Sequence, residues 1–283
     1  GSVLGLWSTC YQLGSVLSTS FAAYMLGQFG WRWSFFGSSM IMLVIWIIVY
    51  FLHPIRPENV GLPPIVDEDE PEEIVAKQEE GKGLGWNREV VITVITMGFI
   101  YFGIKFLRYA LWSWAPFLLR NNFHLAGDNA GYLSTVFDIM GFTGVIFAGF
   151  VSDRLFKGKR ALLSFLMLSG MALSFVLMYT AGTTSLVYFT ISMGFAGFLL
   201  AGPDSMISGV GAIDVGTKQG AIVAAGIING TGSIGPIFQE QIIGWLYEKY
   251  DYSLVPIFIL LMVVAMLTAL LTFTLWVKLK KRT

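Results

Sequence analysis

Long apolar runs separated by short polar segments make up most of this chain. Eight of the runs are long enough for bilayer-crossing helices, because a hydrocarbon core of about 30 Å takes about 20 residues of helix. They cover residues 4–27, 33–53, 91–119, 128–151, 161–181, 184–212, 219–247 and 254–277, and glycine and proline interrupt the sixth and seventh. The pattern predicts an all-α polytopic membrane protein.

Lysine and arginine are distributed unevenly among the segments that join these runs. Thirteen lie in one alternating set of segments, and three, Arg32, Arg120 and Lys249, lie in the other set. Basic residues are retained on the cytoplasmic side of membranes. We therefore expect both ends of the chain to be cytoplasmic, in a multi-pass protein of the inner or plasma membrane. The two remaining bases, Lys105 and Arg108, fall inside the third run.

The one long polar stretch, residues 54–89, contains an acidic run at 67–73 and is expected to be a cytoplasmic linker. Like-charge blocks of this kind are usually solvated and disordered, and recruitment of a partner is the alternative. The linker divides the chain into residues 1–53, with two predicted helices, and residues 90–283, with six.

Composition excludes several classes of function. Hydrophobic residues are 55% of the 283 positions and charged residues 13%, so lipid is the expected surrounding of most of the chain. The formal net charge is zero, so no overall electrostatic field would attract nucleic acid, and nucleic acid is not expected as a partner. With one cysteine and two histidines, we expect no disulfide, no metal site and no cofactor. No nucleophile lies at a workable spacing from a base, so an enzyme is not expected.

A weak internal repeat relates the first two predicted helices to the last two. At an offset of about 218 residues, the Gly-Ser-Val at 14–16 resembles the Gly-Ser-Ile at 232–234, and Gly27 resembles Gly244. A repeat that returns after six helices in the same orientation is typical of the two six-helix halves of major facilitator transporters. Residues 1–53 are then the last two helices of the first bundle. Residues 90–283 are the complete second bundle, and we expect four further N-terminal helices, which would be its partners, to precede Gly1.

The segment between the fourth and fifth runs resembles the GxxxDRxxGRR loop of major facilitator proteins. An aspartate at a helix end can pair with bases or cap a neighbouring helix, and such a contact must break when the bundles rock. This implies a gating loop, and an ordinary cytoplasmic base-rich loop is the alternative. The matching residues are Gly149, Asp153, Arg154, Gly158, Lys159 and Arg160.

Several stretches together resemble the organophosphate:phosphate antiporter family. Arg-Pro-Glu-Asn-Val-Gly-Leu-Pro-Pro at 56–64 is similar to the start of that family's central linker. Phe-Leu-Arg-Tyr at 106–109 and Trp-Ala-Pro at 114–116 are similar to its seventh helix. Gly-Tyr-Leu-Ser-Thr-Val-Phe-Asp at 131–138 and Gly-Thr-Gly-Ser-Ile-Gly at 230–235 look most like the sugar-phosphate exchangers.

This chain also departs from the bacterial members of that family. They carry Trp-Asn-x-x-His-Asn in the fifth helix, whereas Tyr11 stands here where their substrate-contacting histidine stands. Lys105 matches the vertebrate type, and Arg108 keeps the arginine of the bacterial type. The identity of the substrate is therefore left open by the resemblance.

Lys105 and Arg108 are the strongest candidates for substrate contact. A basic residue at a helix centre is unfavourable by about 2.5 to 3.5 kcal/mol, so its presence needs a reason. The two lie one helical turn apart on one face, where a guanidinium fork and a compact ammonium suit a phosphate monoester. The alternative is that they pair with membrane carboxylates, for which Asp138 and Asp204 are available.

Other candidate site residues have weaker support. Tyr11, Tyr109 and Trp112 could line a sugar cavity, although most aromatic residues here are expected to be packing or interface anchors. Asp138 is either a substrate-site residue or a hydrogen-bonding group between helices, with proton coupling as a further possibility. For Asp204 we expect a cap beside a break at residues 202–203.

Small residues recur in the fourth and seventh runs, at Gly141, Gly144 and Ala148 and at Gly226 and Gly230. They predict close approach between helices. The Gly230–Pro236 stretch also weakens its helix, so bending there during transport is a secondary hypothesis.

The family resemblance implies secondary active transport. The expected activity is exchange of a sugar phosphate or glycerol phosphate for inorganic phosphate by alternating access, without a chemical step. Two alternatives stay open: a membrane sensor of external sugar phosphate, and a transporter of a non-phosphorylated organic anion.

Overall fold

The structure is a computed structural model that describes residues 2–54, 57–63, 86–156, 159–207 and 218–280. These residues form helices and their connections and include no strand, which confirms the predicted all-α class. Most of the expected linker, including its acidic run, lies outside the described residues.

Each predicted run contains a long helix whose ends lie within a few residues of the expected ones. The run at 128–151 is divided in two at Thr135, and residues 208–212 of the sixth run lie outside the described part of the chain. The helices are α1 (Ser2–Phe29), α2 (Trp31–Leu52), η1 (Pro57–Val60), α4 (Arg88–Phe123), α5 (Gly127–Ser134), α6 (Val136–Arg154), α7 (Arg160–Leu177), η2 (Met178–Gly182), α8 (Leu186–Ser205), α10 (Lys218–Lys249) and α11 (Val255–Lys280).

Seven spans in the described residues are long and apolar enough to cross a membrane, judged by length and composition. One of them joins α5 and α6 as Gly127–Arg154. The 28-residue α1 is also long enough, but it is not among the seven. The protein is therefore a multi-pass helical membrane protein.

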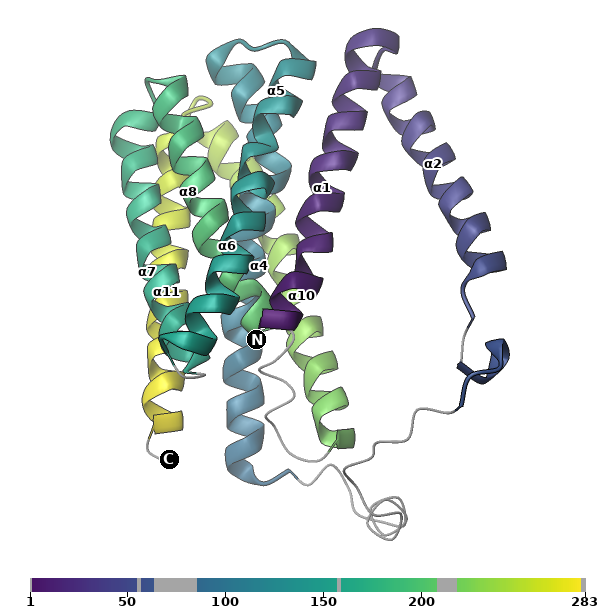
Figure 1. Cartoon of the computed structure of the whole chain (residues 1–283). Helices are drawn as coiled ribbons and strands as arrows, with labels where there is room; N and C mark the ends of the chain where they lie inside the picture. Colours follow the sequence, from purple (N-terminus) through teal and green to yellow (C-terminus); the bar gives the residue numbers. More distant parts are fainter. Residues whose placement is uncertain (1, 55–56, 64–85, 157–158, 208–217, 281–283) are drawn as a thin grey trace, which may run out of the picture.

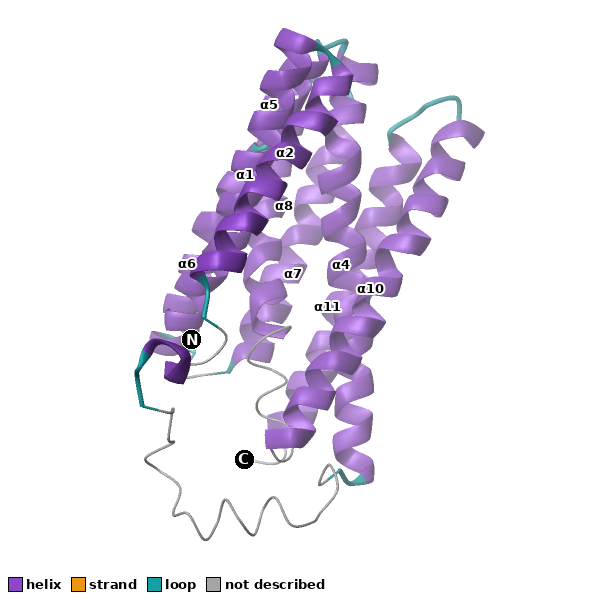
Figure 2. Ribbon diagram, turned by 90° about the vertical axis from the view of Figure 1, so that its right-hand side faces the viewer, coloured by secondary structure: helices purple, strands orange, loops and turns teal. Residues whose placement is uncertain are grey.

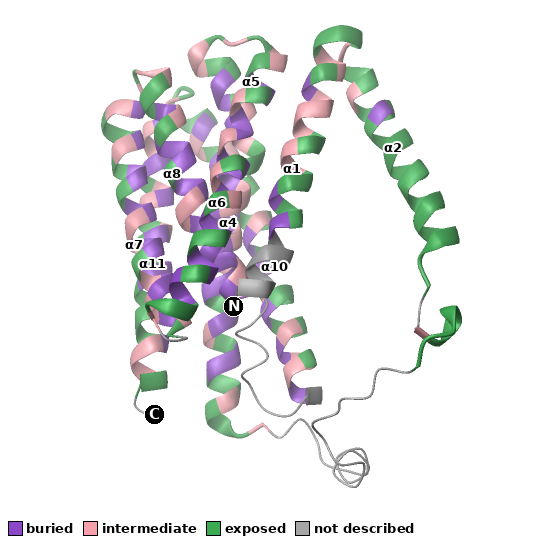
Figure 3. Cartoon of the chain, viewed as in Figure 1, coloured by how far each residue is buried: buried purple, intermediate pink, exposed green. Residues whose placement is uncertain are grey.

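Helices α4, α6, α7, α8, α10 and α11 stand side by side as a bundle (Figure 1; Figure 2). Buried side chains concentrate in its interior (Figure 3), including Ile104, Met171, Phe175 and Phe258. Outward-facing apolar side chains such as Leu173 are exposed, as expected for a surface that lipid covers.

Helices α1 and α2 form a hairpin beside this bundle. Helix α1 packs against α5 and α6, whereas α2 leads away from the bundle (Figure 1). Within the described residues, the one buried position of α2 is Gly37, where an added Cβ would lie 3.3 Å from the ring of Phe21 in α1.

The expectation of a helix break at residues 202–203 is wrong. Helix α8 runs through Pro203 to Ser205, so there is no break at residues 202–203 for Asp204 to cap. Membrane helices tolerate proline where neighbouring helices hold them in place, and the packed neighbours of α8 do so here. Helix α10 also runs through Pro236, and bending there during transport stays a prediction.

The small residues of α6 pack as expected. A Cβ added at Gly144 would collide with the backbone carbonyl of Phe198 in α8, and one added at Gly202 would lie 2.6 Å from Cβ of Ala148. A Cβ added at Gly141 would make ordinary contacts at 3.5 Å. This backbone approach lets α6 and α8 pack closely.

The corresponding expectation for α10 is wrong. A Cβ added at Gly226 or Gly230 would meet nothing within 4 Å in the described structure. Gly232 and Gly235 provide the close approach instead, against the Tyr101 ring and the Phe102 carbonyl of α4. The small residues that matter lie on the face of α10 turned toward α4.

Candidate anion-binding site

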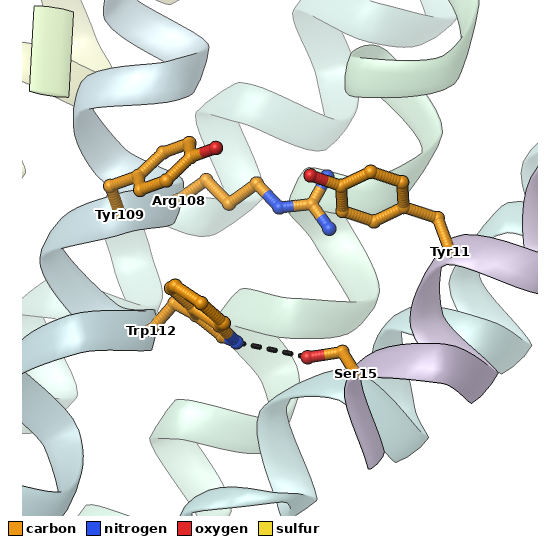
Figure 4. A pocket seen from close by; sticks show the side chains of 5 residues that line it. All are labelled: Tyr11, Ser15, Arg108, Tyr109 and Trp112. Atoms are coloured by element: carbon orange, nitrogen blue, oxygen red, sulfur yellow. Dashed lines mark hydrogen bonds between the residues drawn. The ribbon is translucent and has the colours of Figure 1, made fainter. Parts of the chain in front are cut away.

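A polar cavity lies where α1 and α4 meet. Tyr11 and Ser15 from α1, with Arg108, Tyr109 and Trp112 from α4, line a volume of about 200 Å³ (Figure 4). Tyr11, Arg108 and Tyr109 also line an adjoining volume of about 380 Å³, to which Lys105, Asp204 and Asn229 contribute. The two volumes share a wall, so side chains of α1, α4, α8 and α10 surround one polar region.

Arg108 is paired with a carboxylate. Its Nη1 donates to Oδ2 of Asp204 in α8, and the two side chains are only 12% and 10% exposed. The guanidinium carbon also lies 4.3 Å from the centroid of the Tyr11 ring, a favourable cation–π distance. Of the two carboxylates considered as partners, Asp204 is therefore the one in contact, and it balances the charge of Arg108.

Lys105 has a different environment. Its ammonium donates to Oδ1 of Asn229 at 2.7 Å and to Oγ of Ser233 at 2.8 Å, both in α10. It also lies 5.0 Å from the centroid of the Tyr101 ring. Among the described residues, no carboxylate lies within salt-bridge distance of Lys105. Its positive charge is therefore held by neutral groups.

Ser15 joins three helices in the cavity wall. Its hydroxyl donates to Oδ2 of Asp138 in α6 at 2.7 Å. It accepts from Nε1 of Trp112 in α4 at 2.9 Å (Figure 4). Asp138 is buried, with 3% exposure. This contact links a helix of the predicted first bundle to two helices of the second.

The structure brings all six expected substrate-site residues into one region. Lys105, Arg108, Tyr11, Tyr109 and Trp112 line the cavity. Asp138 does not line it but accepts a hydrogen bond from Ser15, which does. The assignment of these residues to substrate binding stays a prediction.

Asn229 and Ser233 were not expected to be part of the site. They lie four residues apart in α10, which places them on the same face of a helix. The repeat contained a signal for both, because it aligns Ser15 with Ser233 and the same offset of about 218 aligns Tyr11 with Asn229. Equivalent positions of α1 and α10 therefore contact the two bases or their neighbours.

Glu240 was also missed. Its carboxylate accepts from Oγ of Ser113 at 2.6 Å and from Nε1 of Trp114 at 2.8 Å. It forms a second polar connection between α4 and α10, separate from that of Lys105. The one signal for it in the sequence is that Glu240 is a carboxylate inside the seventh apolar run.

The expected gating loop connects α6 and α7 at the end of the bundle that also holds the C-terminus (Figure 1). Gly149 is buried in α6, and Asp153 and Arg154 end α6. Lys159 immediately precedes α7, which begins at Arg160, whereas Gly158 lies outside the described residues. Arg154 lies over the ring of Phe150 at 4.6 Å. A gating role for this loop stays a prediction.

Long apolar helices around a polar region with two membrane-embedded bases define a multi-pass membrane protein with a site suited to a small anion. The sequence model of the Major Facilitator Superfamily matches residues 1–239, and the chain belongs to that superfamily.

Curated relatives narrow the comparison. Sugar phosphate exchanger 3 of Bos taurus is 28% identical over 93% of this chain and 58% of the relative. The Homo sapiens protein of the same name is 27% identical with the same coverage. "Putative glycerol-3-phosphate transporter 1" of Arabidopsis thaliana is 29% identical over 96% of this chain and 56% of the relative.

These matches confirm the resemblance to the organophosphate:phosphate antiporter family. The chain spans less than two thirds of the length of these curated relatives, at 58% and 56%.

Proposed function

We propose that the protein containing this chain exchanges an organophosphate, such as a sugar phosphate or glycerol phosphate, for inorganic phosphate by alternating access. The observation that carries this proposal is Lys105: a membrane-embedded ammonium at the cavity, bonded to Asn229 and Ser233, with no carboxylate in salt-bridge contact among the described residues. An anion that reaches Lys105 is attracted by its full positive charge. It has to replace only hydrogen bonds to neutral groups and not an ion pair.

Arg108 adds directional donors next to that charge. A guanidinium carries five N–H donors, and the contact with Asp204 uses Nη1. Lys105 lies one helical turn away, so the two bases can contact different oxygens of the same phosphate group. In this proposal Asp204 keeps Arg108 oriented, and phosphate binds to its remaining donors.

The aromatic wall suits the organic part of the substrate. Tyr11, Tyr109 and Trp112 line the cavity beside Arg108. The Tyr109 and Trp112 rings meet edge to face with centroids 5.9 Å apart. Such rings offer an apolar face to the carbons of a sugar or glycerol, and hydroxyl or N–H groups to its oxygens.

The transport cycle would use the boundary between the bundles. The Ser15 hydrogen bonds to Asp138 and Trp112 cross from α1 to the second bundle, so rocking of the bundles must break and remake them. We propose that the loop at residues 149–160 gates this movement. We also propose that the protein lies in the inner or plasma membrane with both ends of this chain cytoplasmic.

Competition binding tests the substrate class. The full-length protein in detergent should bind radiolabelled phosphate, and glycerol-3-phosphate or glucose-6-phosphate should displace it. Lys105→Ala should weaken this binding. Lys249→Ala should not, because Lys249 is the last residue of α10 and does not line the cavity. Binding of an organic anion that phosphate does not displace would instead support transport of a non-phosphorylated anion.

A further inference from the structure

A separate, very small cavity also borders the Arg108–Asp204 pair. Its volume is about 10 Å³, and its polar lining is Gln12 of α1, Arg108 of α4, Asp138 of α6 and Asp204 of α8. That volume is at the lower limit for one water molecule. The cavity is too small for a substrate, so any occupant has atomic dimensions.

Apart from the Arg108–Asp204 pair, two residues of this lining each contain a buried acceptor that lacks a donor. Oδ1 of Asp138 and Oε1 of Gln12 are buried and have no hydrogen-bond partner in the described part of the chain. Their residues are 3% and 4% exposed. Buried polar atoms normally have partners, and an ionised carboxylate is costly to bury with one neutral donor. Both atoms are acceptors, so each needs a donor, and a proton bound to the carboxylate would make Asp138 a donor.

The charged and titratable groups around Asp138 favour its neutral form. Arg108 from α4 and Asp204 from α8 line the same cavity, while Tyr11 of α1 and Tyr109 of α4 face Arg108 from the substrate side. Arg108 is in contact with Asp204. Two carboxyl groups that share a site rarely ionise together, and the one without a cationic partner takes the proton.

We propose that Asp138 is an exchangeable proton-binding site whose occupancy is coupled to anion binding at Lys105 and Arg108. A proton from solvent forms an O–H bond at Oδ1, which turns one orphaned acceptor into a donor. This coupling rests on the proposed anion site, whereas the proton site itself does not.

The coupling follows from the charges of the site. With Asp138 neutral, Lys105 and Arg108 exceed Asp204 by one positive charge, which attracts an anion. With Asp138 ionised, the four charges cancel and the attraction is lost. Proton and anion therefore favour each other's binding, and each must raise the affinity for the other by the same factor.

Calorimetry of phosphate binding to the full-length protein, in buffers of different ionisation enthalpy, measures the coupling. Phosphate changes its own protonation equally in every variant, so differences between variants belong to the protein. The wild type should take up more protons per phosphate than Asp138→Asn, by up to about one. Asp251→Asn is the matched control, an exposed aspartate in the α10–α11 connection with φ 49° that asparagine tolerates. Equal uptake in wild type and Asp138→Asn at every pH across a series from acidic to alkaline would overturn the coupling.

Infrared difference spectra between acidic and alkaline pH, without phosphate, test the proton site separately. The wild type and Asp251→Asn should show the carbonyl stretch of a protonated carboxylic acid that Asp138→Asn lacks. Its absence from the wild type at every pH would mean that a water molecule or a metal cation satisfies an ionised Asp138, and the proposal would be wrong. If the band is present but phosphate does not bind, the proposed function fails and the proton site stands.

Discussion

At the scale of single residues, the two membrane-embedded bases are not equivalent. Each carries the cost of a charge near a helix centre, about 2.5 to 3.5 kcal/mol. Arg108 meets it with a carboxylate and an aromatic ring, and Lys105 meets it with an amide, a hydroxyl and an aromatic ring. Arg108 is suited to orientation, and Lys105 supplies the net charge.

Arg108→Lys separates substrate contact from simple charge balance. The change keeps the charge but removes the planar fork, so phosphate affinity of the full-length protein should fall by about 1.5 to 3 kcal/mol if a charged hydrogen bond is lost. Equilibrium binding of phosphate at matched expression measures this. Near-normal affinity would mean that Arg108 only neutralises Asp204.

Asp204→Ala tests the ion pair through stability. Removing one partner of a buried pair leaves an uncompensated charge, which costs about 3 to 5 kcal/mol. Asp204→Ala should therefore lower the free energy of unfolding in detergent strongly. Arg108→Ala combined with Asp204→Ala should be less destabilising than the sum of the two single changes. Additivity of the two changes would show that the pair contributes nothing.

At the scale of helices, hydropathy predicts which segments form helices. It predicts little about which face of each helix contacts its neighbours. All eight runs became helices because backbone groups in lipid must be satisfied within the helix. The same reasoning could not tell which glycines of α10 face α4, and it expected a break at Pro203 where packing maintains the helix. Which face of a helix is in contact depends on the neighbouring helices, and the sequence of one run contains no information about them.

Gly144→Ala and Gly226→Ala test which glycines pack. A Cβ at Gly144 collides with a backbone carbonyl that cannot move aside, so we expect destabilisation of about 1 to 3 kcal/mol. Gly226→Ala has open space and should be neutral or stabilise by up to about 1 kcal/mol, because alanine favours helix. Denaturant unfolding in matched detergent compares the two. Equal effects would contradict the α6–α8 packing described above.

The site was predictable in part for a related reason. Lys105 and Arg108 stood out because charge in a lipid-embedded helix is rare. The contact between Arg108 and Asp204 spans 96 residues, and no local pattern distinguishes Asp204 from Asp138 as the partner. Asn229 and Ser233 are neutral and common in sequence, so only the repeat marked their positions.

At the scale of the whole molecule, the connections separate into two ends as the positions of lysine and arginine predict. The α6–α7 connection, the start of α4 and the end of α11 share one end, and the α1–α2, α4–α5 and α10–α11 connections share the other (Figure 1). Within the first group, Lys278 donates to Oγ1 of Thr93 at 3.1 Å.

Cysteine labelling tests the orientation of these ends. With Cys10 replaced, Asn121→Cys should react with an impermeant thiol reagent added outside intact cells. Asp69→Cys, in the acidic linker, should react only after permeabilisation. The physical reason is that basic residues are retained on the cytoplasmic side, and one set of connecting segments contains thirteen of them while the other contains three. The reverse pattern would invert the topology.

The central claim is exchange of an organophosphate for phosphate, and counterflow in proteoliposomes measures it most directly. Vesicles containing the full-length protein and loaded with phosphate should take up external radiolabelled glycerol-3-phosphate or glucose-6-phosphate. Vesicles without internal phosphate should take up far less, and Lys105→Ala should abolish the difference. Binding of the same ligands without any phosphate-dependent uptake would contradict the account and indicate a sensor.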